Sequence, residues 1–532
     1  MATAGDIVLT VVTGVFLLLI IVASIFGLAH LQDPLERKAA WFPKVVCIMA
    51  AVTSAVMILL LPLDVAGRKP VGTPPFIPVY LLTLIAYGLS LFLLAFLIPL
   101  AFLHYDALEE PEHDVDTVLK NASQGRSSAG ASKQLFHALK WTLPFTLALV
   151  ALVGGLYYAY GYSRLPTAFL ESVGSTVAGR ATCVAAGDCL AWTRFMYIRI
   201  NPLLYGVAIV NLIGMVFLML YGGVGLICLP LDLLRSFINR PRAMSISAVV
   251  DARARLYTRS QELTTEAQKL LAERDELRAK GGFLKNLTRS GALDSQSRRL
   301  AAKVFELEEQ AHKLEIARSI SEESVLVQFF KLALSIIGFI FSILWLLHLA
   351  LYFAPVTFGM KPVSAFMNAV FAGLSKVPFL GPAFYAIFAL HLLLCLAHGS
   401  VRLGRLSSIL GAVHSIRPGR TLTSALLFHS WLLVAGAQAV SHAGARVFGS
   451  YARDTASGRI ANTQLANLSG GVGHGFDALI CLMGVMAVVT ALLACILPAR
   501  KRKKKVKLVS EKERARNRQK ENNYEMRQRA GK

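Results

Sequence analysis

Nine apolar stretches, each long enough to cross a lipid bilayer, constrain this sequence more than any other feature. A hydrocarbon core about 30 Å thick requires about 20 apolar residues in a helix. Helices meet this requirement because backbone amides in lipid must find their partners within the protein. One long charged stretch, residues 237–328, interrupts the series and cannot enter lipid. The pattern predicts an all-α, polytopic transmembrane helical bundle with one helical module in water.

The apolar stretches and the charged interruption divide the chain into four regions. Spans one to five occupy residues 1–236, a cytosolic helical hairpin 237–328, spans six to nine 329–498, and a basic cytosolic tail 499–532. The spans themselves are expected at approximately 7–30, 45–64, 79–103, 141–160, 203–230, 329–353, 380–402, 421–440 and 476–497. The first apolar run is too long for the core of a signal peptide, so we expect it to remain as a span.

The composition supports a membrane protein and argues against nucleic-acid binding. Hydrophobic residues make up 55% of the 532 residues and charged residues only 16%, whereas a soluble chain carries about 25% charged residues. The net charge of +23 is concentrated beyond the last span, where residues 500–532 contain 15 Lys or Arg and 4 Asp or Glu. A basic tail beside a span is typical of an orientation signal that contacts anionic lipid. We therefore expect membrane lipids as partners.

Basic residues in short loops predict which ends of the spans face the cytosol. The loop after span seven has no acidic residue and contains four arginines: Arg402, Arg405, Arg417 and Arg420. This loop and the basic tail should both be cytosolic. Counting spans backwards then places the hairpin in the cytosol and the N-terminus outside the cell or in a lumen.

Two features fall on the non-cytosolic side in this orientation. Cys183 and Cys189 lie in the loop between spans four and five, in a compartment where a disulfide can form and persist. Asn467 begins the sequence Asn-Leu-Ser, an acceptor for N-glycosylation. The sequence therefore predicts a Cys183–Cys189 disulfide and a glycan on Asn467.

The charged interruption contains two heptad-like series that predict a coiled-coil hairpin. The seam residues are Leu256, Leu263, Leu270 and Leu277 in the first helix, and Leu300, Val304, Leu307 and Leu314 in the second. Gly281-Gly282 separates the two series, as expected where the chain folds back. An exposed seam favours a protein partner or self-association, although a solvated charged helix pair with no partner remains an equal alternative.

The sequence Leu-Pro-Leu-Asp occurs twice, at the ends of spans two and five. It places Pro62 and Asp64 in the first copy and Pro230 and Asp232 in the second. Ionisable residues near spans are functional candidates, and proline frees carbonyl groups that could bind an ion. The two copies should finish on opposite membrane faces, however. We therefore favour helix capping, or pairing with nearby basic residues (Arg68 or Lys69; Arg235), over a gating role in transport.

Three glycines precede the second copy of this motif: Gly222, Gly223 and Gly225. Glycines inside a span allow two helices to approach closely. A nucleotide-binding loop is excluded because no strand precedes them and no Gly-Lys-Ser/Thr follows. We expect a role in helix packing.

His391, Cys395 and His398 share one face of span seven, and His429 lies in span eight. Imidazole and thiolate are metal ligands, and a corrinoid cobalt could also accept an imidazole. No Cys-x-x-Cys or His-Glu-x-x-His pattern accompanies them, so neutral histidines hydrogen-bonded in the bundle are the favoured interpretation. No catalytic signature is present either. We expect no enzymatic activity, no cofactor and no metal.

The chain resembles the limb-region family of membrane proteins, which includes the lipocalin-interacting membrane receptors and the lysosomal cobalamin transport escort protein. Tyr221–Asp232 and Phe237–Pro241 are similar to the glycine-rich exit of span five in that family, and Leu60–Val65 to its exit of span two. Arg417–Thr421 with Ala425–Phe428 resembles the cobalamin branch. The loop with the two cysteines is similar to receptor-like, plant-type members.

This resemblance implies a non-enzymatic receptor or escort protein that acts in ligand uptake or vesicular trafficking. The alternative is a transporter or transport subunit, specifically for cobalamin export from lysosomes. Either role implies a plasma or endolysosomal membrane and a possible extracellular or lumenal ligand. A transporter also needs a water-accessible polar cavity near the midplane, and few charged residues are available in the spans to line one.

Overall fold

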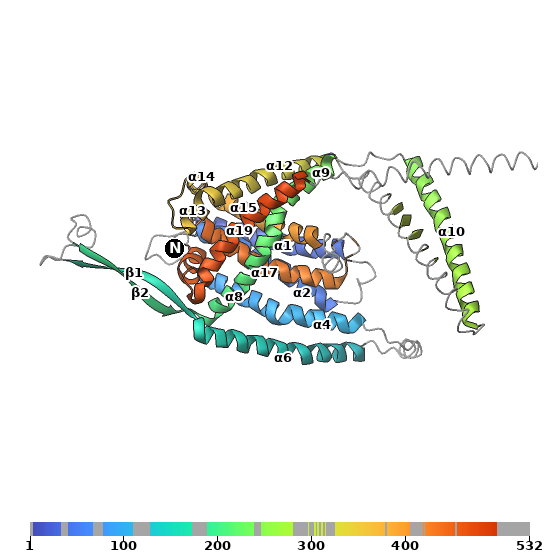
Figure 1. Ribbon diagram of the computed structural model, residues 1–532, viewed down its shortest axis with the longest axis horizontal. Helices are drawn as coiled ribbons and strands as arrows, with labels where there is room; N and C mark the ends of the chain where they lie inside the picture. Colours follow the sequence, from blue (N-terminus) through green and yellow to red (C-terminus); the bar gives the residue numbers. More distant parts are fainter. Residues whose placement is uncertain are drawn as a thin grey trace, which may run out of the picture. The chain divides into compact units, whose positions relative to one another are not determined.

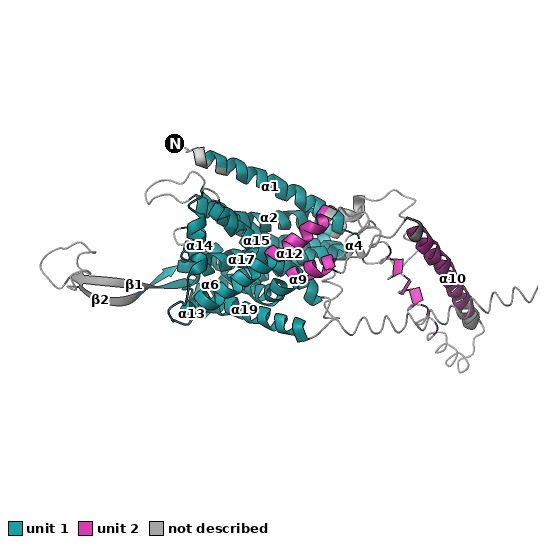
Figure 2. Cartoon of the chain, turned by 90° about the horizontal axis from the view of Figure 1, so that it is seen from above, with its two compact units in different colours: residues 1–229, 338–532 teal, residues 230–337 magenta. Residues whose placement is uncertain are grey.

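The computed structural model contains two compact units (Figure 2): residues 1–229 with 338–532, and residues 230–337. It describes residues 4–32, 41–67, 78–109, 128–172, 189–238, 246–279, 325–377, 380–404, 421–452 and 455–496. Residues 416 and 419 and nine positions between 296 and 314 are also described. The second unit is slightly wider than the predicted insertion, because it includes the end of span five and the start of span six.

Nine helical segments in the described part of the chain are long and apolar enough to cross a membrane (Figure 1). Spans one, two, four, seven, eight and nine are single helices: α1 (Ala4–Leu31), α2 (Trp41–Ala66), α6 (Ser128–Tyr160), α15 (Leu380–Gly404), α17 (Thr423–Val447) and α19 (Val472–Ile496). Spans three, five and six each contain several helical elements. The chain is therefore an integral membrane protein, as the sequence predicted.

A π-helical turn lies inside each of these three composite spans. Span three comprises α3 (Val79–Phe92), the π turn η2 (Leu93–Leu97) and α4 (Ile98–Glu109). Span five comprises α8 (Pro202–Phe217), η3 (Leu218–Gly222) and α9 (Gly223–Ile238). Span six comprises α12 (Val325–His348), η4 (Leu349–Phe353) and α13 (Ala354–Thr357). Such turns are rare and are often found at functional sites.

The connections between spans contain structure that the sequence analysis did not predict. The short helix α14 (Phe366–Leu374) follows span six. Between spans eight and nine lie α18 (Ala456–Arg459), a fourth π turn η5 (Ile460–Leu465) and the 3-10 turn η6 (Ser469–Gly471). Several span boundaries also differ from those expected. The helix of span four begins at Ser128 and that of span nine at Val472, both before the predicted starts.

Two β-strands correct the prediction that the region between spans four and five is a simple loop. β1 (Tyr162–Ser172) and β2 (Cys189–Arg199) form an antiparallel ribbon, with Tyr162 opposite Arg199 and Ser172 opposite Cys189 (Figure 1). The guanidinium of Arg164 lies 3.8 Å from the ring centroid of Phe195 on the opposite strand. This cation–π contact supports the pairing of the two strands. The fold is an α-helical bundle with this one β ribbon.

Span eight lies at the centre of the first unit. Buried residues make up 78% of its apolar window, against 0% for span one and 6% for span four. Helix α17 is rich in small residues, which allow neighbouring helices to approach closely. For example, a Cβ on Gly214 of span five would overlap the carbonyl oxygen of Ala435. Spans one and four instead expose almost all of their apolar side chains, as expected for helices that face lipid.

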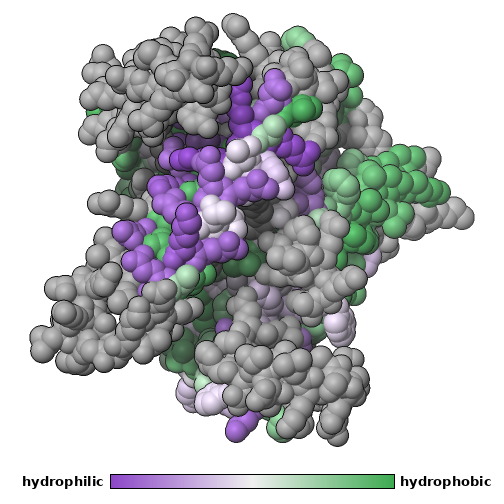
Figure 3. All heavy atoms as spheres, turned by 90° about the vertical axis from the view of Figure 1, so that its right-hand side faces the viewer, coloured by the Kyte–Doolittle hydropathy of each residue, from purple (hydrophilic) through white to green (hydrophobic). Residues whose placement is uncertain are grey.

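The second unit contains the helix α10 (Ile246–Ala279), whose described side chains are mostly hydrophilic (Figure 3). Leu263 is buried, and Leu256 and Leu270 are half-buried. The ammonium of Lys303 lies 2.7 Å from a carboxylate oxygen of Glu266, so the chain folds back against α10. Described residues of the second series are helical. Leu277's side chain and much of the second helix lie outside the described residues, so the coiled coil stays a prediction.

Candidate functional site at the ribbon end of the bundle

The carboxylate of Asp64 caps a helix that is almost 400 residues away in sequence. Its oxygens accept hydrogen bonds from the backbone N–H groups of Ala456 (2.9 Å) and Ser457 (2.7 Å), and from the Ser457 hydroxyl (2.6 Å). Asp64 is only 7% exposed. These three bonds join the end of span two to α18. Capping was the favoured interpretation, but the capped helix is α18; Arg68 and Lys69 lie outside the described residues.

The base of the β ribbon also binds the connection between spans eight and nine. The backbone N–H of Arg164 donates to the carbonyl of Asn467 (2.8 Å), and the Ser469 hydroxyl donates to the carbonyl of Tyr160 (2.6 Å). We call this end of the first unit the ribbon end. Spans alternate in direction, so the connections after spans four and eight should lie on the same membrane face. In the structure these two connections are in contact.

The connection between spans six and seven reaches the same end. The hydroxyl groups of Ser375 and Tyr451 lie 3.0 Å apart. The ring of Phe371, on α14, packs against Tyr451 with centroids 4.9 Å apart. These contacts bring three inter-span connections and the end of span two into one polar and aromatic assembly.

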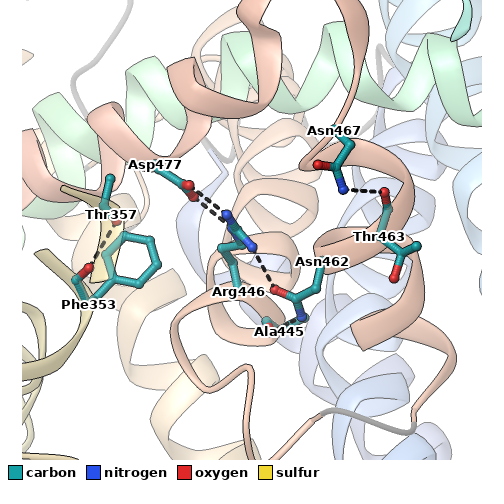
Figure 4. A network of polar contacts seen from close by, with 8 residues as sticks. All are labelled: Phe353, Thr357, Ala445, Arg446, Asn462, Thr463, Asn467 and Asp477. Carbon is teal, nitrogen blue, oxygen red and sulfur yellow. Dashed lines mark hydrogen bonds and ion pairs between the residues drawn. The ribbon is translucent and has the colours of Figure 1, made fainter. Parts of the chain in front are cut away.

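An ion pair joins spans eight and nine at the ribbon end (Figure 4). The guanidinium of Arg446 donates two hydrogen bonds to the carboxylate of Asp477, at 2.8 and 2.7 Å. It also donates to the side-chain oxygen of Asn462 (3.1 Å), whose amide donates to the Ala445 carbonyl (2.9 Å). The Asp477 side chain is 6% exposed. The sequence analysis missed this network, although an Arg and an Asp beside apolar spans were a sufficient signal.

A polar cleft of about 350 Å³ lies beside this network. It is lined by Tyr352, Gly449, Ser450, Gly458, Asn462 and Thr463. A second cavity, beside the Asp64 cap, has a volume of about 10 Å³ and includes Tyr87, Ser441 and Ser457 in its lining. A cavity of that size holds about one water molecule. Of these two cavities, the larger has room for a ligand.

The glycine-rich segment of span five packs tightly against span seven. A Cβ on Gly225 would overlap the carbonyl oxygen of Cys395, and a Cβ on Gly399 would overlap that of Tyr221. Backbones can come this close only where both helices lack side chains at the contact. The two glycines therefore form a reciprocal contact between spans five and seven.

Two further glycines of the same segment face span nine. A Cβ on Gly223 would lie 2.8 Å from the carbonyl oxygen of Met483. A Cβ on Gly222 would lie 3.4 Å from the sulfur of the same residue. The glycine-rich segment thus has a packing role on two sides.

His391 belongs to a hydrogen-bonded chain that compensates for the proline in span five. Pro230 removes the donor for the carbonyl of Leu226, four residues earlier. The Ser342 hydroxyl donates to this carbonyl at 2.7 Å. Because that hydroxyl has one proton, His391 Nε2, 3.1 Å from the Ser342 oxygen, is the donor between them. Cys395 Sγ lies 3.5 Å from the same nitrogen. The freed carbonyl therefore binds a side chain.

Two further histidines were candidates for the same polar site. His429 Nδ1 hydrogen-bonds to the carbonyl of Ala425 in its own helix, at 2.8 Å. His398 is half-buried. Within the described part of the chain, no group of three or more His, Cys, Asp or Glu is arranged to hold a metal ion. Hydrogen-bonded histidines in the bundle remain the better interpretation.

The remaining predicted sites have different outcomes. Asp232 lies 3.7 Å from Arg235 one turn later, which is the pairing that the sequence favoured. Cys189 is the first residue of β2, whereas Cys183 lies outside the described residues, so the disulfide stays a prediction. The side-chain amide of Asn467 donates to the Thr463 carbonyl at 3.0 Å. Glycosylation of Asn467 also stays a prediction.

Comparison with known proteins places the whole architecture in a family. The model of the LMBR1-like membrane protein family matches residues 9–287, which include the first five spans, the β ribbon and α10. The chain belongs to the LMBR1-like family of membrane proteins. The matched region of this LMBR1-like protein includes the β ribbon and the glycine-rich segment of span five. No solved structure matches the chain.

Several LIMR family proteins are similar to the chain over most of its length. One from Arabidopsis thaliana is 29% identical, and the match covers 87% of this chain and 91% of the relative. One from Oryza sativa subsp. japonica is 27% identical, with the same coverage. One from Dictyostelium discoideum is 23% identical and covers 87% of this chain and 92% of the relative. The resemblance to the lipocalin-interacting receptor family is thereby confirmed.

Proposed function

We propose that this LMBR1-like protein is a non-enzymatic membrane receptor or escort protein that acts in ligand uptake or vesicular trafficking. In this proposal the ribbon end faces the lumen or the exterior and binds the ligand. The module around α10 faces the cytosol and binds a protein partner. The basic tail contacts anionic lipid, and the protein resides in the plasma or endolysosomal membrane.

One observation carries the proposal: the ionisable residues at the ribbon end already have structural partners. The Asp64 carboxylate accepts three hydrogen bonds, and Asp477 accepts two from Arg446. A transporter needs polar groups that line a water-accessible cavity near the midplane. The cavity beside the Asp64 cap, at about 10 Å³, has room for about one water molecule. These groups thus serve to hold the bundle together, which suits a receptor or escort protein better than cobalamin export.

The cytosolic part of the proposal rests on one face of α10. Leu256, Leu263 and Leu270 are less exposed than their neighbours on this helix, as expected for a seam. Substituting Leu270→Lys would place a charge in the seam. Leu271→Lys is a matched control, because the adjacent Leu271 side chain is 58% exposed.

Proximity labelling from the cytosolic module in cells tests this role. We expect Leu270→Lys to lose the labelled partners and to redistribute the protein among organelles, whereas Leu271→Lys behaves as the unmodified chain. Equal labelling by both variants would contradict the partner-binding role of α10. In parallel, the purified chain in proteoliposomes should move no radiolabelled cobalamin. Cobalamin flux above that of protein-free liposomes would favour the transporter instead.

A further inference from the structure

We infer that the cleft at the ribbon end is a binding site for an uncharged, polyhydroxylated ring of the hexose class. The inference rests on the proposed function, because it specifies the chemistry of the ligand that the ribbon end would bind. At about 350 Å³ the cleft falls within the range of small-molecule sites, about 300–1,000 Å³. Four of its six lining residues carry polar side chains, an unusually polar lining for such a site.

Two π-helical turns meet at the cleft. Tyr352 lies on η4 of span six, and Asn462 and Thr463 lie on η5, between spans eight and nine. A π turn sacrifices regular helical hydrogen bonding and persists mostly where it has a functional role. Two of the four π turns of the described chain contribute to this one cleft, which distinguishes it from other polar positions at the ribbon end.

The lining of the cleft favours an uncharged ligand over a charged one. No lining residue carries a formal charge. Arg446, which binds the lining residue Asn462, also donates two hydrogen bonds to Asp477. Its charge is therefore neutralised by a carboxylate and is not available to a phosphate or sulfate. The lining side chains therefore offer an anion no compensating charge, whereas a neutral polar molecule can exchange its hydrogen bonds with water for hydrogen bonds to the lining.

The polar groups of the cleft are held in place and can both donate and accept hydrogen bonds. Asn462 is fixed by Arg446 and by the Ala445 carbonyl. The ring of Tyr352 stacks on His348, with centroids 4.9 Å apart and planes 6° from parallel. Hydroxyl groups of Tyr352, Ser450 and Thr463 can rotate to either role. Several adaptable hydroxyls around a fixed amide and an aromatic ring match a sugar ring, which has hydroxyls at its edge and C–H groups on its faces.

Two sources could supply this chemistry: a free sugar, or the headgroup of a neutral glycolipid in the adjacent leaflet. The full chain in lipid nanodiscs allows both to be tested. The free probes are methyl β-D-glucopyranoside and methyl β-D-galactopyranoside, observed by saturation-transfer NMR. The lipid probes are nanodiscs that contain glucosylceramide or galactosylceramide, compared with ceramide alone, with thermal stability as the readout.

Substitutions in the cleft decide whether binding occurs there. Ser450 and Thr463 are both exposed, so Ser450→Trp, which fills the cleft, and Thr463→Val, which removes one hydroxyl, should leave the fold intact. We expect Ser450→Trp to abolish binding and Thr463→Val to weaken it at least tenfold. Ser364→Ala, in the connection between spans six and seven and outside the cleft lining, serves as the control and should bind as the unmodified chain does.

Three results would overturn the inference. These are no binding of any neutral glycoside or glycolipid, binding that Ser450→Trp leaves unchanged, and tighter binding of glucose 6-phosphate than of the neutral glycosides. A response to the glycolipids alone would identify the headgroup as the source, and a response to the free glycosides would identify soluble sugar. If the unmodified chain binds no sugar while Leu270→Lys still loses the labelled cytosolic partners, this inference fails and the proposed function stands.

Discussion

Removing the Asp64 carboxylate should destabilise the ribbon end far more than removing the carboxylate of its sequence counterpart, Asp232. Both residues end a Leu-Pro-Leu-Asp sequence, so they offer the same substitution in two different environments. Asp64 is 7% exposed and caps α18 with three hydrogen bonds. Asp232 is more exposed and lies 3.7 Å from Arg235 on its own helix.

The magnitude follows from the bonds that each substitution breaks. A hydrogen bond to a charged group contributes about 1.5–3 kcal/mol, and an orphaned buried donor costs about 1–3 kcal/mol. Asp64→Ala removes the acceptor for the N–H groups of Ala456 and Ser457, while the Ser457 hydroxyl can rotate toward Thr455, 3.4 Å away. We expect a loss of about 3–5 kcal/mol in the free energy of unfolding.

Asp64→Asn removes the negative charge but keeps the size and shape of the side chain. The amide oxygen can still accept from Ala456, but its NH2 group would face the N–H of Ser457, so two donors would meet. We expect an intermediate loss of about 1.5–3 kcal/mol. Asp232→Asn should change stability by less than about 1 kcal/mol, because its pair with Arg235 is long, at 3.7 Å, and partly exposed to solvent.

Two measurements check these values on the full chain. Unfolding in mixed micelles with increasing SDS gives the global free energy. Amide hydrogen exchange of residues 456–465 reports local detachment of α18, which could occur without global unfolding. If Asp64→Ala lowers neither the midpoint nor the local protection more than Asp232→Asn does, the reasoning is refuted.

Two further predictions concern contacts between spans. Gly225→Ala should destabilise the bundle by about 3 kcal/mol or more, because the new Cβ would overlap the carbonyl oxygen of Cys395 and one span must move. Gly154→Ala is the control, because nothing lies within 4 Å of a Cβ there. It should leave the free energy of unfolding unchanged in the same SDS titration. Asp477→Asn should cost about 2–4 kcal/mol, because Arg446 would keep its hydrogen bond to Asn462 but lose its charged partner. The double variant with Arg446→Met should recover part of that loss. Strict additivity of the two single changes would show that the pair is not coupled.

The spans were predictable because their signal is local. An apolar run of sufficient length determines a helix in lipid whatever the rest of the chain does. The packing role of the span-five glycines was also predictable, because three glycines close together in one span indicate a close approach of two helix backbones. Boundaries were less accurate where a span begins with polar residues, as at Ser128, because helix continues beyond the lipid-exposed portion.

The partners of the polar residues were not predictable, because they depend on contacts between distant segments. Asp64 was expected near its own helix end, but its partners are at Ala456 and Ser457. His391 was expected to be hydrogen-bonded within the bundle, but its partner could not be named from the sequence: it completes the compensation for Pro230 through Ser342. The β ribbon was missed because β2 is rich in aromatic residues but does not alternate apolar and polar residues, and is therefore a weak strand signal beside nine strong helices.

These contacts also bear on the choice between receptor and transporter. Alternating access requires one group of spans to move against another, between states that differ by only a few kcal/mol. The Asp64 cap joins span two to the connection between spans eight and nine, and the Arg446–Asp477 pair joins spans eight and nine directly. We expect a loss of about 3–5 kcal/mol when the Asp64 cap is removed and about 2–4 kcal/mol when the Arg446–Asp477 pair is disrupted. The reciprocal Gly225–Gly399 contact also packs the backbones of spans five and seven closely together. A motion that separated these spans from one another would have to replace these contacts, whereas a receptor or escort protein needs none of them to break.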